Sequence, residues 1–65
     1  MTLEKARELL SLQASMGSGY NRNAARLILA EVQREHGQGA VDDLIRGLGL
    51  EQTFGLKPGT TFKHP

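Results

Sequence analysis

The chain has 65 residues, a mass of 7.1 kDa and no cysteine, with eight basic and seven acidic side chains. This length allows one small domain, for which surface scaling gives roughly 4,100 Å² exposed when folded against about 10,300 Å² when unfolded. Stability cannot come from disulfides, and two histidines offer little for a structural metal site. We therefore expect self-association or a protein partner to contribute to stability.

The charges are balanced along the chain. Residues 1–36 carry five basic and four acidic side chains, and residues 37–65 carry three of each, so the formal net charge is +1. Nucleic-acid binders and membrane-surface helices usually carry a basic patch or face. Because no such block is visible in the sequence, a dedicated nucleic-acid or membrane protein is not expected.

Targeting signals are also missing from the sequence. The first residues lack the basic and apolar pattern of a secretory signal, and no stretch approaches the ~18 apolar residues of a membrane span. The absence of cysteine fits a reducing compartment, so we expect a cytoplasmic protein.

The first predicted helix spans residues 2–16, with Thr2 as its N-cap. Its apolar side chains cover an arc of about 200°. They are Leu3, Ala6, Leu9, Leu10, Leu12, Ala14 and Met16. A face this wide needs cover on more than one side, which predicts a helix packed between two neighbours.

The second predicted helix spans residues 21–36, with Asn21 as N-cap, Asn23 as the rival cap, and the Tyr20 ring packing near Ala25. Its apolar stripe consists of Ala25, Ile28, Leu29 and Val32, and Leu27 lies outside it. Gly37 suits the left-handed position after the last turn.

The third predicted helix spans residues 40–48, with Gly39 as N-cap and an ion pair between Asp42 and Arg46. Gly49 is expected to end the helix, and Leu50 is placed for the apolar contact with the last helical turn that often accompanies a glycine at this position. One further turn is predicted over residues 50–54.

The remaining residues predict a tail that packs on the helices. Residues 57–60 have the Pro and Gly positions of a type II turn, and Phe54, Leu56 and Phe62 are too apolar for a solvated tail. The predicted fold is therefore all-α: a compact three-helix bundle over residues 1–56, a fourth one-turn helix, and an extended C-terminal tail at 57–65 packed on it.

The second and third helices, joined by a turn of about four residues, have the outline of a helix-turn-helix. A DNA-reading helix should present basic or amide side chains to the major groove. The outer face of the third helix instead presents Asp42, Asp43 and Arg46. This favours an ordinary helical corner over a DNA-binding motif.

The glycines at 17 and 19 precede a helix, as in loops that bind phosphate with backbone N–H groups. The preceding strand and third glycine of a dinucleotide site are absent, so a flexible connector is the simpler interpretation. The candidate anion site consists of Gly19, Tyr20, Asn21, Arg22 and Asn23.

No constellation of residues indicates catalysis, a metal or a cofactor. His36 lies at a predicted helix end, where a capping role is favoured over metal binding because no second ligand lies at helical spacing on its face. No serine or threonine is linked in sequence to a base. We therefore expect no enzyme activity, no metal and no cofactor.

The leading functional hypothesis is a protein-interaction module that forms a homodimer or binds a larger cytosolic protein. Its surface would include Leu12, Met16 and Leu27, because three short helices cannot easily cover all of this apolar surface. Two alternatives remain: a nucleic-acid-associated regulator that uses Arg22, Arg26 and Arg34, and an anion or small-ligand binder at residues 17–23.

Overall fold

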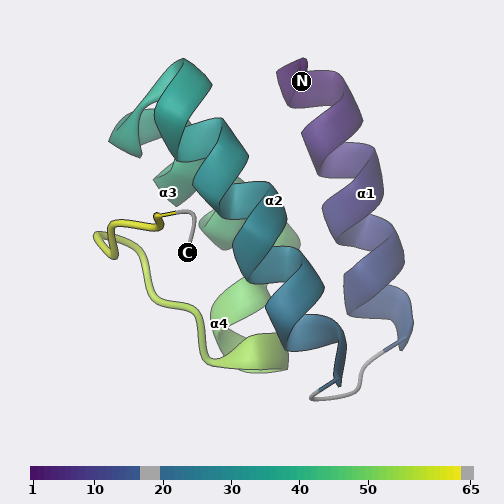
Figure 1. The fold of residues 1–65 in the computed structure, drawn as a ribbon. Helices are drawn as coiled ribbons and strands as arrows, with labels where there is room; N and C mark the ends of the chain where they lie inside the picture. Colours follow the sequence, from purple (N-terminus) through teal and green to yellow (C-terminus); the bar gives the residue numbers. More distant parts are fainter. Residues whose placement is uncertain (17–19, 64–65) are drawn as a thin grey trace.

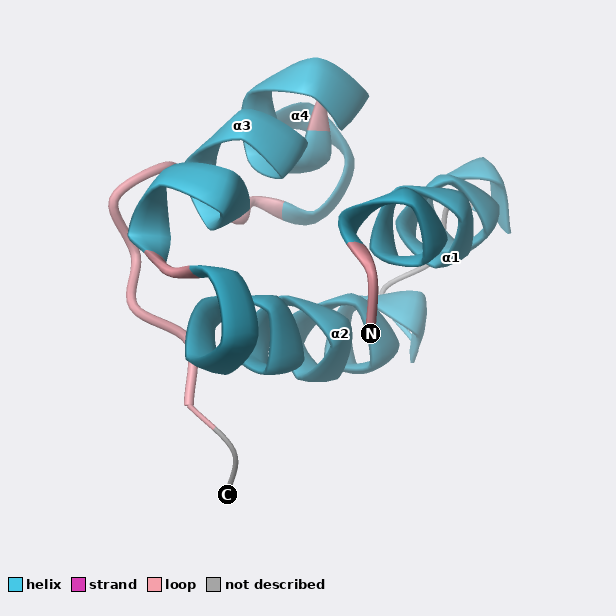
Figure 2. Cartoon of the chain, turned by 90° about the horizontal axis from the view of Figure 1, so that it is seen from above, coloured by secondary structure: helices cyan, strands magenta, loops and turns pink. Residues whose placement is uncertain are grey.

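The computed structural model describes residues 1–16 and 20–63, and all regular structure in these residues is helical. The helices are α1 (Leu3–Met16), α2 (Tyr20–His36), α3 (Gln38–Leu48) and α4 (Leu50–Phe54). Helices α1 and α2 lie side by side, and α3 and α4 lie behind them (Figure 1). Residues 55–63, the C-terminal segment, run along the flank of α2 opposite α1 (Figures 1 and 2). The predicted all-α bundle with a short fourth helix is confirmed.

Helix α1 begins as its sequence predicts. The Thr2 hydroxyl accepts a hydrogen bond from the Lys5 N–H at 3.1 Å, which is an N-cap contact. The helix packs on α2, α3 and α4, but only Ala6 and Leu10 are buried on it. Leu12 and Met16 are 54% and 53% exposed, so the bundle covers its wide apolar face only in part.

The connection between α2 and α3 is a single residue, Gly37. Its φ of 88° and ψ of 178° lie in a region open essentially only to glycine, and not in the predicted left-handed helical region. The prediction of Gly39 as N-cap is wrong because the Gly37 carbonyl already accepts the Val41 N–H at 3.3 Å, which places Gly39 inside α3. With no four-residue turn, the helix-turn-helix outline fails as well.

The predicted N-caps of α2 also need correction. The helix begins at Tyr20, so Asn21 and Asn23 lie in its first turn and neither is the N-cap. The Asn21 amide instead donates to Gln13 Oε1 at 2.7 Å, which ties α2 to α1. The predicted packing of the Tyr20 ring lies outside the described part of the chain.

The end of α3 agrees with the prediction. Gly49 adopts the left-handed conformation (φ 65°, ψ 36°), its N–H donates to the Ile45 carbonyl, and Leu50 is fully buried. The predicted ion pair between Asp42 and Arg46 is wrong. Asp42 Oδ1 instead accepts hydrogen bonds from the Gly59 N–H and the Gln38 amide at 2.8 and 2.9 Å.

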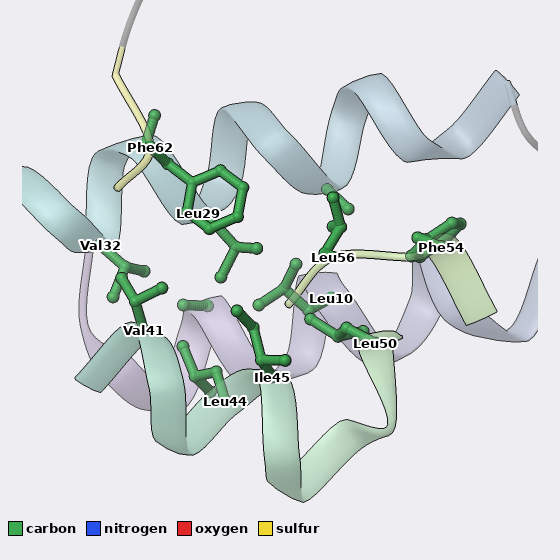
Figure 3. Close-up of a cluster of buried hydrophobic side chains, with 13 residues drawn as sticks. Leu10, Leu29, Val32, Val41, Leu44, Ile45, Leu50, Phe54, Leu56 and Phe62 are labelled. Carbon is green, nitrogen blue, oxygen red and sulfur yellow. The ribbon is translucent and has the colours of Figure 1, made fainter. Parts of the chain in front are cut away.

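The C-terminal segment belongs to the core. Gly59 has a φ of +88° and the Thr60 N–H donates to the Lys57 carbonyl at 3.3 Å, in agreement with the predicted type II turn. Leu56 and Phe62 are 4% and 6% exposed, and Figure 3 shows Phe62 beside Leu29 of α2. The accessible surface of 3951 Å² is close to the expected value. No described helix is long and apolar enough to cross a membrane.

Candidate functional site

A groove lies between the first half of α2 and the C-terminal segment, with a volume of about 620 Å³. We call it the basic groove, because four cationic side chains line it. Two come from α2 and two from the C-terminal segment: Arg22, Arg26, Lys57 and Lys63. They are half of the eight basic residues of the chain.

Within residues 1–16 and 20–63, no acidic group neutralises the cations of the basic groove. No carboxylate lines the groove, and within the described residues none of the four cations has an acidic partner within 4.0 Å. A concave surface with one sign of charge concentrates counter-ions and steers charged ligands toward itself. The arrangement therefore favours an anionic ligand.

The groove also offers apolar surface. Leu56 and Phe62 line it but are almost fully buried, whereas Leu27, also part of the lining, is 49% exposed. Leu27 is therefore by far the most exposed of the three apolar side chains Leu27, Leu56 and Phe62 in the lining. Asn23, Thr60 and Thr61 add amide and hydroxyl groups to the lining.

The outer wall of the groove is held by hydrogen bonds from α2 and α3. Besides the Asp42 bond to Gly59, the Gln38 amide donates to the Thr60 carbonyl at 2.9 Å, and Gln33 Oε1 accepts the Phe62 N–H at 3.4 Å. The pKa of Asp42 is lowered, first by the hydrogen bond from Gly59 and then by the one from Gln38. The charged form of Asp42 therefore favours the hydrogen bond that holds the C-terminal segment on α3.

Arg22 joins the groove to the end of α4. Its Nε–H donates to the Phe54 carbonyl at 2.8 Å, where a helix leaves its last carbonyls without intrahelical partners. The other donors of the guanidinium have no hydrogen-bond partner in the part of the chain that the structure describes. Arg22 therefore has a structural contact and free donors for a ligand at the same time.

The predicted interaction residues do not gather in one place. Leu27 lines the basic groove, whereas Leu12 and Met16 are exposed on α1 and are not part of its lining. Arg34 is not part of the lining either, and its Nη2 lies 3.8 Å from Glu31 Oε1. The three arginines of the nucleic-acid hypothesis therefore do not share one site, because Arg22 and Arg26 line the groove and Arg34 does not.

The predicted anion site is also divided. Gly19 lies outside the described residues, and Tyr20 and Asn21 form the start of α2. Arg22 and Asn23 line the basic groove. The cationic residues that the structure places together are therefore only partly those of the predicted anion site, and the sequence interpretation missed Lys57 and Lys63.

His36 lies at the opposite end of α2 and is exposed. One ring nitrogen, Nε2, is 2.9 Å from the Met1 carbonyl oxygen, and the neighbouring Glu35 pairs with the Met1 amino group at 2.7 Å. The hydrogen bond between the Met1 amino group and Glu35 raises the pKa of the amino group and lowers the pKa of Glu35. No group of three or more metal-ligating side chains occurs within residues 1–16 and 20–63.

Comparisons of the chain with protein-family models, with curated proteins and with solved structures find no match.

Proposed function

We propose that the chain is a small, non-catalytic protein-interaction module and that a segment of a larger partner protein binds in the basic groove. One observation carries the proposal: a half-exposed leucine, Leu27, lies in a groove beside cations that have no acidic partner within 4.0 Å among the described residues. Exposed apolar surface with a polar rim is typical of interaction sites. The volume of about 620 Å³ is in the range of concave binding sites.

The chemistry of the lining favours binding over catalysis. The groove is lined by guanidinium, ammonium, amide, hydroxyl and apolar groups. Proton transfer in enzymes is most often carried by histidine or a carboxylate, and among the described residues that line the groove neither occurs. Cytoplasmic location, expected from the composition, belongs to the same proposal.

Photo-crosslinking in the cell of origin tests the docking site. A photoreactive amino acid replaces Leu27 in one variant and Leu12 in a matched control, since the two leucines are 49% and 54% exposed. We expect one defined partner protein to be crosslinked from position 27 and not from position 12. Crosslinking only from position 12, or no crosslinked protein from position 27, would overturn the proposal.

Self-association through α1 is a second candidate function. Leu12 and Met16 lie four residues apart, on one face of the helix, and more than half of each side chain is exposed. A two-fold dimer could bury this face against its own copy. Sedimentation velocity at tens of micromolar tests this candidate: it requires a dimer that dissociates when both residues are changed to serine, and a monomeric wild-type protein excludes it at that concentration.

The nucleic-acid alternative receives less support. Arg22 and Arg26 line the groove, but Arg34 does not. A single-strand binder usually stacks bases on aromatic side chains, and the aromatic residue in the groove lining, Phe62, is 6% exposed. Salt-dependent binding of an oligonucleotide would support this alternative.

A further inference from the structure

We infer that the basic groove recognises an acidic peptide segment that carries an apolar side chain between its acidic residues. The inference rests on the proposed function and adds the chemistry of the partner. The observation behind it is that four cations, two on each wall of the groove, lie beside the exposed side chain of Leu27. The occupant is thus a segment of another protein with Asp or Glu on both sides of a Leu, Ile, Phe or Met.

The position of the cations supports an acidic occupant. Arg22 and Arg26 are four residues apart on α2, so they lie on neighbouring turns of one face. Lys57 and Lys63 belong to the opposite wall, formed by the C-terminal segment. Carboxylates within the groove would therefore meet positive charge on both sides, and the terminal guanidinium groups could bind them in bidentate geometry.

The apolar part of the lining supports one anchoring side chain. Burial of the exposed surface of Leu27 is most favourable against an apolar group, because a polar group would lose its own hydration there. Leu56 and Phe62 line the groove on its core side. A small inorganic anion would satisfy the cations but leave Leu27 in water. A peptide that combines acidic and apolar side chains satisfies both parts of the groove.

A selection experiment tests the inference even though the partner protein is unidentified. The full chain is immobilised and a library of random nine-residue peptides is selected on it. We expect enrichment of peptides with a negative net charge and a central apolar residue. A failure to enrich any peptide, or enrichment of neutral or basic sequences, would overturn the inference.

Matched variants then locate the binding site of a selected peptide by fluorescence anisotropy. R26Q/K57Q and R34Q/R46Q each change the formal net charge from +1 to −1, but only the first pair lines the groove. We expect about tenfold weaker binding for R26Q/K57Q and less than about twofold for R34Q/R46Q. Equal losses in both would show non-specific charge attraction and contradict the inference.

The apolar contact has its own control. Leu27→Ser should weaken binding of the selected peptide by about fivefold. Leu12→Ser, at a residue of similar exposure on α1, should leave the affinity unchanged. Stronger groove-dependent binding of a single-stranded oligonucleotide than of the selected peptide would replace this inference with the nucleic-acid alternative. A groove-dependent crosslinked partner whose docking segment is not acidic would overturn the inference and leave the proposed function standing.

Discussion

The carboxylate of Asp42 accepts a hydrogen bond from the backbone N–H of Gly59 at 2.8 Å, across 17 residues of sequence. Asp42 lies on α3 and Gly59 is the left-handed residue of the turn in the C-terminal segment. The same oxygen accepts a hydrogen bond from Gln38, whose amide also contacts the Thr60 carbonyl. This contact holds the segment that supplies Lys57 and Lys63 to the basic groove.

Acidification should release this contact. The folded pKa of Asp42 is below its ordinary value of 3.8, so its stabilising contribution is complete above pH 3.8 and is lost as the pH falls through the folded pKa. We expect the amide resonance of Gly59 to shift in that range. In Asp42→Asn, which cannot titrate, the Gly59 resonance should lack this transition. An identical acid transition in both proteins would show that another carboxyl group controls the segment.

The two glycines around Gln38 should respond to alanine with opposite signs. Gly37 has a φ of +88°, which alanine rarely adopts, so Gly37→Ala should destabilise the protein by about 1–3 kcal/mol. Gly39 lies inside α3 with no atom within 4 Å of an added Cβ, so Gly39→Ala should stabilise it by about 0.5 kcal/mol. Urea denaturation measures both. Destabilisation by Gly39→Ala would instead favour Gly39 as the true N-cap, where alanine is unfavourable.

The helices could be predicted from the sequence where local signals are unambiguous. The apolar stripe of α3 and the cap at Thr2 point to one structure each, and so does Gly49 followed by Leu50. The sequence Gly37–Gln38–Gly39 offers two glycines that are equally suitable by local chemistry. In the structure the Gly37 carbonyl accepts the Val41 N–H, so α3 starts immediately after α2, and its side chains Val41, Leu44 and Ile45 are buried in the core. This choice depends on the fold as a whole and not on a local pattern.

The candidate site was less predictable because its two walls are distant in sequence. Arg22 and Arg26 are separated from Lys57 and Lys63 by about thirty residues or more, and each half of the chain is nearly neutral. The apolar residues of the C-terminal segment did predict that it folds back. Its path along α2, which brings the two pairs of cations together, depends on contacts such as Asp42 to Gly59 that no local pattern indicates.

Arg22 should contribute to stability as well as to binding. Its Nε–H donates a hydrogen bond to the Phe54 carbonyl at the end of α4. Because Arg22→Ala leaves that carbonyl without this donor, the variant should have a free energy of unfolding about 1 kcal/mol lower than the wild type. Arg26→Ala removes a neighbouring cation that makes no such contact and should change stability by less than about 0.5 kcal/mol. Thermal unfolding of the two variants compares them directly. If both lose the same stability, the Phe54 contact is not what distinguishes Arg22.

Truncation of Phe62 tests whether the C-terminal segment unfolds cooperatively with the helices. The side chain is 6% exposed, and truncating a buried phenylalanine costs about 3–5 kcal/mol when the whole core responds. We expect Phe62→Ala to cost about 3 kcal/mol, near the lower end, because the segment has no helix and can partly detach. That is a large share of the roughly 3–5 kcal/mol that a core of this size supplies.

Urea denaturation followed by far-ultraviolet circular dichroism measures this loss. The adjacent Thr61→Ala is the control, because Thr61 is exposed and its hydroxyl makes one long hydrogen bond, 3.4 Å to Gln38. This variant should stay within about 0.5 kcal/mol of the wild type. A loss for Phe62→Ala as small as that of the control would mean that the helices fold without the segment, and the basic groove would then lack a fixed outer wall.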